Sequence, residues 1–173
     1  MELIKIEHIY HGEKTEDYDE PIYTEINDNI KIHYSLFLEN GQKIETQYDK
    51  IPFYIEELGY SYDCFENTEE ENDGTIIKGL DKVITELKLG DFVRVNIPCE
   101  YAYGEKGIPL DDKGISYLIP KRTNLIYYIQ LIYIERNNNI FEYPNIINLN
   151  KLVISDDIDK IKNKMNIYIN RNS

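Results

Sequence analysis

Residues 75–104 place the strongest constraint on how this chain can fold. Apolar residues recur there at positions i, i+3, i+4 and i+7 with charged residues between them, which predicts an amphipathic helix of about two turns. They are Leu80, Val83, Ile84 and Leu87. Gly90 follows where a helix end favours a positive φ. Val93, Val95 and Ile97 then alternate with polar residues, as in a half-buried strand. We therefore expect one short helix packed on a sheet.

The clearest strand precedes this stretch, at residues 30–38. Alternate apolar side chains share one face of it, namely Ile30, Ile32, Tyr34, Leu36 and Leu38. Asn40 and Gly41 are typical of a type I′ turn, so residues 43–47 should return antiparallel to this strand. Pro52 then begins a further short strand that contains Phe53 and Ile55. These elements predict a hairpin followed by a third strand.

The remaining patterned segments lie near the two ends of the chain. Residues 2–10 alternate weakly and favour an edge strand, whereas residues 123–134 are apolar on both faces, as a covered central strand should be. Ser155 and the two aspartates after it are typical of a helix start, and Ile158, Ile161 and Met165 would share one face of that helix.

The bulk composition excludes several classes of function. A net charge of −13 and a pI near 4.6 argue against a surface for nucleic acid or anionic membrane, and favour neutral or basic protein partners. The N-terminus lacks the basic and apolar regions of a secretory signal, and the most apolar run, 125–134, is too short to cross a bilayer. Cys64 and Cys99 match no metal or redox spacing, which favours reduced thiols and a cytoplasmic location.

Two features resemble metal sites, and we favour a simpler interpretation of each. His8 and His11 would point to opposite faces of a strand with no third ligand near, so we expect solvent-exposed histidines. The acidic segment 61–74 partly imitates a calcium loop, but Leu80 stands where that loop needs a bidentate glutamate. A solvated acidic loop fits better. We therefore expect neither a metal nor a cofactor.

Four segments together resemble the FKBP family of peptidyl-prolyl cis/trans isomerases. They read IKIHYSLFLENGQKIETQ, TIIKGLDKVITELKLGD, VRVNIPCEYAYGEKGIP and NLIYYIQLIYI, in the order and at the spacing of that family. The resemblance covers residues 29–135 and implies an α+β fold, in which a twisted antiparallel sheet wraps around one short helix. It divides the chain into an N-terminal extension (1–28), an isomerase domain (29–136) and a C-terminal extension (137–173).

The resemblance also implies a site for X-Pro bonds of protein substrates. Its catalytic residues would be Tyr34, Phe53, Tyr103 and Tyr127. Residues that bind substrate, or macrolides such as tacrolimus and rapamycin, would be Ile44, Glu45, Ile76, Ile77, Leu80, Ala102, Leu118 and Ile119. Tyr103 would donate its hydroxyl to a carbonyl of the bound molecule, and Ile77 its backbone N–H. For Tyr34 and Ile77 taken alone, plain core packing is an equal alternative.

The chain departs from the family pattern at several of these positions. Leu80 stands where the family usually has the tryptophan of the pocket floor, and Ile44 and Glu45 replace phenylalanine and aspartate. Tyr127 stands where phenylalanine is common. A leucine floor offers less aromatic contact, so we expect a weak isomerase that assists protein folding. The alternative is a non-catalytic interaction or co-chaperone module with the same fold.

Overall fold

The computed structural model describes residues 3–12, 18–46, 50–59 and 76–172. Within these ranges the chain forms a seven-stranded antiparallel sheet, a two-stranded sheet and three α-helices. The large sheet contains β1 (Lys5–Tyr10), β2 (Asn29–Leu38), β3 (Lys43–Ile44), β4 (Phe53–Ile55), β5 (Phe92–Ile97), β8 (Leu125–Arg136) and β9 (Asn139–Glu142). The small sheet contains β6 (Ile108–Pro109) and β7 (Tyr117–Ile119). The helices are α1 (Lys78–Ile84), α2 (Leu149–Leu152) and α3 (Ile158–Asn172), with a 3-10 turn at Cys99–Tyr101.

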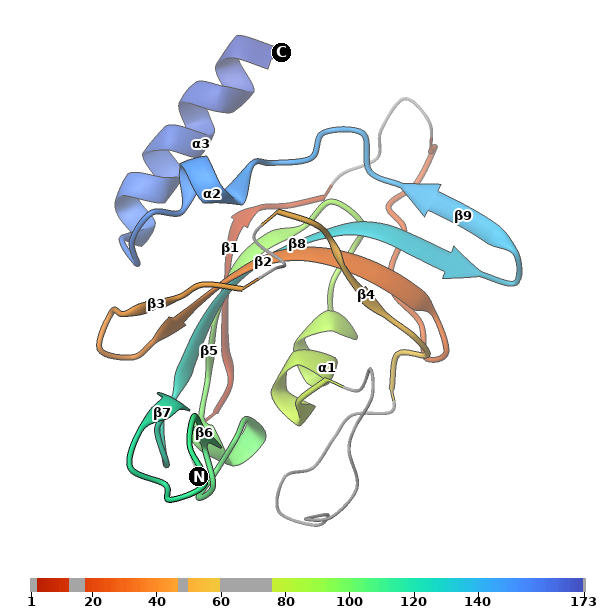
Figure 1. Cartoon of the computed structure of the whole chain (residues 1–173). Coiled ribbons are helices and arrows are strands. Elements are labelled where there is room, and N and C mark those ends of the chain that lie inside the picture. The colour runs from red at the N-terminus through yellow and green to blue at the C-terminus, as the bar shows by residue number, and fades with distance from the viewer. Residues whose placement is uncertain (1–2, 13–17, 47–49, 60–75, 173) are drawn as a thin grey trace.

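The strand order places β8 at the centre of the large sheet. The order is β1-β5-β8-β2-β3, while β4 pairs with β2 and β9 pairs with β8. Figure 1 shows α1 against one face of this sheet, with α2 and α3 on the opposite side. The predicted α+β fold, an antiparallel sheet around one short helix, is confirmed.

Helix α1 is shorter than its apolar stripe predicts. It ends at Ile84 with Thr85 as its C-cap, yet Leu87 is still fully buried. The chain after the helix stays in place because the N–H of Thr24 donates to the Leu87 carbonyl and the N–H of Leu89 to the Ile22 carbonyl. Gly90 has the expected positive φ of 91°, but it lies in the turn before β5 instead of capping the helix.

The turn between β2 and β3 also differs from its prediction. The N–H of Leu38 donates to the Gln42 carbonyl and the N–H of Gly41 to the Leu38 carbonyl, which closes a three-residue loop. Gly41 alone in this loop has a positive φ, at 94°, whereas a type I′ turn needs two such residues. The hairpin is confirmed and its turn type is corrected. Strand β3 ends at Ile44, so it is shorter than predicted.

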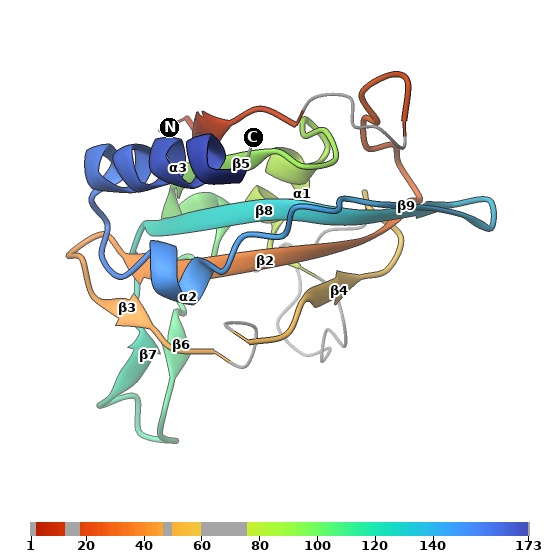
Figure 2. The ribbon, with the colours of Figure 1, turned by 90° about the horizontal axis from the view of Figure 1, so that it is seen from above.

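The outer face of the sheet, opposite α1, is covered by the C-terminal part of the chain. Phe37, Phe92 and Tyr128 are fully buried there. They pack with Ile126, Ile147, Leu149, Val153, Ile161 and Met165 in a second apolar cluster. Figure 2 shows α2 over β2, with α3 nearer to β1 and β5. Strand β8 is thus covered on both faces, as the apolar run at 123–134 predicts.

Polar contacts hold the C-terminal part against the outer face. The guanidinium of Arg94 donates twice to the Asp156 carboxylate, from Nε at 2.8 Å and from Nη2 at 2.9 Å, and the Tyr128 hydroxyl donates to the same carboxylate. Asp157 caps α3, since its Oδ1 accepts the N–H of Lys160 at 3.2 Å. Of the three residues predicted as the helix start, Asp157 is therefore the one that caps the helix.

Acid should weaken this attachment. Hydrogen bonds from Arg94 and Tyr128 lower the pKa of Asp156. A carboxyl group whose pKa is lower in the folded state stabilises the fold above its unfolded pKa, and this contribution is lost as pH falls through the folded value. We expect Asp156→Asn to cost about 1–3 kcal/mol in urea unfolding at pH 7 and progressively less as the pH falls below about 4. Asp159→Asn, at an exposed position of α3, is the control. If Asp156→Asn lowers the unfolding free energy equally at pH 7 and below about pH 4, the ionised carboxylate of Asp156 does not stabilise the fold.

Strand β1 pairs with β5 at the edge of the sheet, and it changes how the first two histidines lie. His8 pairs with Val93 and Tyr10 with Phe92, so one additional residue is inserted into β1 between these pairs. A bulge of this kind reverses the alternation of side chains. The predicted placement of His8 and His11 on opposite faces is wrong, because their rings are stacked with centroids 4.2 Å apart.

Some predictions fall outside the described residues. These are Cys64 and the whole acidic segment 61–74, with its resemblance to a calcium loop. Among the residues that are described, no helix is long and apolar enough to cross a membrane.

Candidate active site

Three aromatic rings meet on the face of the sheet that α1 covers. The ring centroids of Tyr34 and Phe53 lie 5.9 Å apart with an interplanar angle of 87°, and those of Tyr34 and Tyr127 lie 5.5 Å apart at 60°. These are edge-to-face contacts of the kind that aromatic pairs prefer. Strand pairing explains the grouping, because β2 lies between β4 and β8. We call Tyr34, Phe53 and Tyr127, together with Tyr103, the aromatic site.

The region of α1, the 3-10 turn and strand β7 bring further predicted residues to the same cluster. Ile76, Ile77, Leu80, Ala102 and Ile119 are all buried in the core that contains Tyr127, and Tyr103 packs against it. The close approach of α1 depends on a glycine. A Cβ added at Gly79 would lie 2.4 Å from a methyl group of Ile97 and 3.0 Å from the Tyr101 carbonyl oxygen, so a larger residue would push the helix away.

The hydroxyl of Tyr127 lies in the buried part of the aromatic site. Tyr127 is only 3% exposed, and burial raises the pKa of its phenol well above the ordinary value. The neighbouring Tyr103 and Tyr34 raise that pKa further. The phenol of Tyr127 therefore stays protonated at neutral pH and keeps an O–H group. The site combines apolar walls with uncharged hydrogen-bonding groups.

The remaining predicted residues lie at the margin of this cluster. Ile44 is buried on β3, opposite Leu36, while Glu45 is exposed directly after that strand. On β7, Ile119 is buried and Leu118 is 39% exposed, because neighbouring residues of a strand face opposite sides. The structure therefore brings Ile44 and Ile119 to the core and leaves Glu45 and Leu118 at the surface.

Two residues of this region were not predicted. Tyr101 and Ile108 are partly buried against the same core. Ile108 pairs with Ile119 across β6 and β7, in a segment where the sequence shows no strand pattern. The strands are too short to show a periodic pattern. The sequence could have indicated Tyr101, because it lies two residues before Tyr103 in the same aromatic run.

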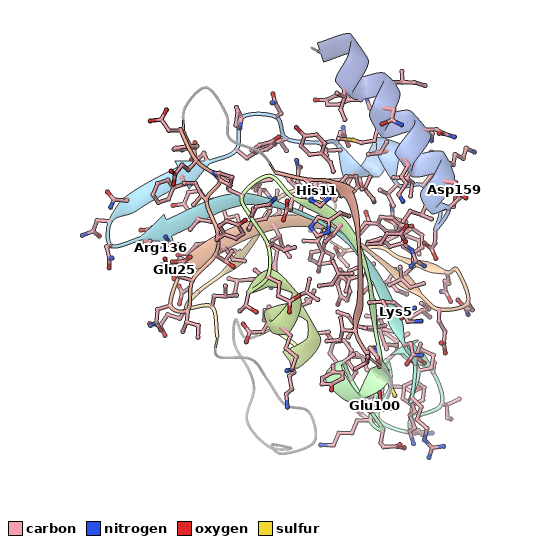
Figure 3. All side chains as sticks on the ribbon, turned by 180° about the vertical axis from the view of Figure 1, so that it is seen from behind. Lys5, His11, Glu25, Glu100, Arg136 and Asp159 are labelled. Atoms are coloured by element: carbon pink, nitrogen blue, oxygen red, sulfur yellow. The ribbon has the colours of Figure 1, made fainter. Side chains whose placement is uncertain are left out.

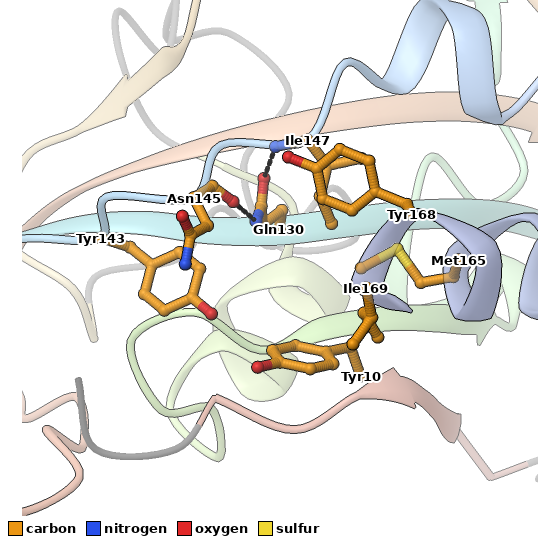
Figure 4. Close-up of a pocket in the computed structure, with 8 residues that line it drawn as sticks. All are labelled: Tyr10, Gln130, Tyr143, Asn145, Ile147, Met165, Tyr168 and Ile169. Carbon is orange, nitrogen blue, oxygen red and sulfur yellow. Dashed lines mark hydrogen bonds between the residues drawn. The ribbon is translucent and has the colours of Figure 1, made fainter. Parts of the chain in front are cut away.

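A hollow lies on the outer face, apart from the aromatic site. Its volume is about 220 Å³, and Figure 4 shows that α3 and the segment after β9 form much of its wall. It is lined by Tyr10, Gln130, Tyr143, Asn145, Ile147, Met165, Tyr168 and Ile169. The amide of Gln130 donates to the Asn145 carbonyl at 3.2 Å and accepts the N–H of Ile147 at 2.9 Å. The buried amide thus holds the C-terminal segment, which is a structural role.

Comparison with known proteins identifies similar sequences. Residues 21–132 match the sequence profile of a family described as FKBP-type peptidyl-prolyl cis-trans isomerase. FK506-binding protein 1 of Kluyveromyces lactis is 33% identical over 108 residues, which are 62% of this chain and 77% of that protein. FK506-binding protein 1 of Saccharomyces cerevisiae is 31% identical over 129 residues, 75% of this chain and 90% of that protein. A peptidyl-prolyl cis-trans isomerase of Schizosaccharomyces pombe is 26% identical over 108 residues, which are 62% of this chain and 79% of that protein.

Proposed function

Because the chain belongs to the family of FKBP-type peptidyl-prolyl cis-trans isomerases and is an isomerase of X-Pro peptide bonds, we propose that the aromatic site carries this activity. The observation that supports this proposal most directly is the edge-to-face packing of Tyr34 with both Phe53 and Tyr127. Rings from three strands provide the apolar wall that a proline ring would contact.

Rotation about an X-Pro bond can be accelerated by an apolar site alone, because no bond is broken. Rotation about a peptide bond has a barrier of about 18–20 kcal/mol, because amide resonance is lost in the twisted state. Planar resonance separates charge, which water stabilises and an apolar site does not. A site that binds the twisted amide better than either planar form therefore accelerates the rotation without breaking a bond.

We assign the hydrogen-bond donors as follows. The hydroxyl of Tyr103 donates to one carbonyl oxygen of the bound segment, and the backbone N–H of Ile77, at the start of α1, donates to another. Leu80 forms the floor, supported by its burial in the core beside Ile77. Residues Ile44, Ile76, Ala102 and Ile119 complete the apolar wall, while Glu45 and Leu118 contact longer substrates from the exposed rim.

The leucine floor supports weak activity. Leucine at position 80 gives less contact with a proline ring than tryptophan would, so both substrate and macrolide should bind less tightly. Because two of the relatives are named FK506-binding protein 1, we propose the same site for tacrolimus and for rapamycin.

The wider role that we propose is assistance of protein folding in the cytoplasm. The net charge of −13 favours neutral or basic proline-containing proteins as substrates. We propose residues 29–136 as the isomerase domain, 1–28 as an N-terminal extension and 137–173 as a C-terminal extension.

A proline-containing tetrapeptide assay, coupled to proteolysis that cleaves only the trans form, tests the proposal. We expect a rate above the uncatalysed background at micromolar protein. Tyr103→Phe removes one hydrogen bond of about 1 kcal/mol and should lower kcat/KM by about fivefold. Tyr23→Phe, at an exposed position, is the control and should change nothing. A rate equal to background would instead favour a non-catalytic interaction module, and equal activity of both variants would contradict the role of Tyr103.

A further inference from the structure

Two histidines and one aspartate meet where β1 ends and β5 begins. The rings of His8 and His11 are stacked, with centroids 4.2 Å apart and an interplanar angle of 7°. The Nε2 atom of His8 lies 3.5 Å from Oδ2 of Asp91. The three residues offer one ligand atom each within 4.8 Å of one another. Figure 3 labels His11 at this end of β1.

The backbone fixes this arrangement. Oδ1 of Asp91 accepts the N–H of Gly12 at 2.6 Å, and Oδ2 accepts the N–H of Lys88 at 2.8 Å. A Cβ added at Gly12 would lie 2.1 Å from the carbonyl oxygen of Leu89, so only glycine permits this close approach. The bulge in β1 then turns His8 toward the same side as His11. Segments far apart in the sequence are thus held together before any ligand binds.

The donor set selects a class of ligand. Imidazole nitrogens suit zinc and other first-row transition metals, whereas calcium and magnesium prefer oxygen donors throughout. Two histidines and one carboxylate are a donor set of known three-ligand zinc sites, with a fourth position left to water. Asp91 is 1% exposed, so its negative charge acts in surroundings where water screens it little. A cation beside it is therefore favoured.

We propose that His8, His11 and Asp91 bind one divalent transition-metal ion, with zinc as the representative case. Zinc at about 2.0–2.1 Å from each donor requires the donors to be about 3.3 Å apart, so the site has to contract slightly. His11 is exposed and can rotate its ring out of the stack, while His8 and Asp91 stay in place. The bound ion would join the end of β1 to the turn before β5.

Titration calorimetry with zinc chloride tests this site on the full chain. We expect one ion per chain, with His8→Ala and His11→Ala each lowering the affinity at least tenfold. His33→Ala is the matched control, because His33 is the third of the three histidines in the chain and lies outside the cluster. It should bind zinc as the unaltered chain does.

A second readout separates metal binding from a folding defect. We expect zinc to raise the thermal unfolding temperature of the unaltered chain and of His33→Ala, and to leave that of His11→Ala unchanged. Since His11 is exposed, its variant should unfold at the unaltered temperature when zinc is absent. Failure of zinc to bind, or binding that neither histidine variant weakens, would overturn the proposal. The isomerase assay is a separate measurement and would not be affected by that result.

Discussion

Phe53→Ala should lower kcat/KM for a proline-containing tetrapeptide by about tenfold to a hundredfold. The phenyl ring contacts Tyr34 edge-on and would face the proline of a bound substrate. Phe53 is partly buried, and a bound proline would cover the rest of its ring. Losing the apolar contact of one such aromatic side chain costs about 1.5–3 kcal/mol, and each 1.36 kcal/mol corresponds to a factor of ten in rate. The protease-coupled assay measures the change directly.

Tyr54→Ala is the matched control for this prediction. Tyr54 is the next residue of β4, it is 39% exposed and it faces away from the aromatic site. It should retain kcat/KM within about twofold, since an exposed ring contributes little to the site. If both variants lose activity equally, the loss reflects damage to β4, and the assignment of Phe53 to the site is wrong.

The double variant Val153→Ala/Met165→Ala should lose about 4–7 kcal/mol of unfolding free energy. Both side chains are buried in the second apolar cluster, which lies on the outer face of the sheet and includes Tyr128. Met→Ala in a core costs about 2–5 kcal/mol, and two lost methyl groups of valine cost about 2 kcal/mol more. Urea unfolding followed by circular dichroism measures the loss.

Its control is the double variant Ile154→Ala/Ile167→Ala, which removes more apolar atoms from the same two segments. Ile154 is 65% exposed and Ile167 is 53% exposed. We expect a loss within about 1 kcal/mol, because exposed positions contribute little to folding. Comparable losses for the two double variants would mean that the C-terminal segment is not anchored by the buried pair.

The sequence predicted elements where one face had to be buried. The alternation through Tyr34 and the double-sided apolar run around Tyr127 gave the central strands, because a regular period follows directly from burial. The position of Gly90 shows the limit of such patterns. Its positive φ was predicted, but hydrogen bonds from distant residues such as Thr24 decide where the helix before it ends.

The outer face was much harder to predict. Gln130 reads as a polar interruption of an apolar run, yet it is fully buried and binds the backbone at Asn145 and Ile147. No local pattern links these positions. The placement of His8 and His11 was predicted wrongly because one inserted residue in β1 reverses the alternation of side chains between the two faces. No residue pattern in the sequence indicates this bulge.

Neighbouring residues of β8 serve the two faces of the sheet. The ring of Tyr127 belongs to the aromatic site, while Tyr128 donates its hydroxyl to Asp156 on the outer side. The two side chains share one peptide unit, so the orientation of one backbone segment determines both. The contact of Tyr128 with Asp156 therefore also constrains the backbone that orients Tyr127. Loss of the Tyr128–Asp156 contact should therefore shift the ring of Tyr127 through the peptide unit that joins the two tyrosines.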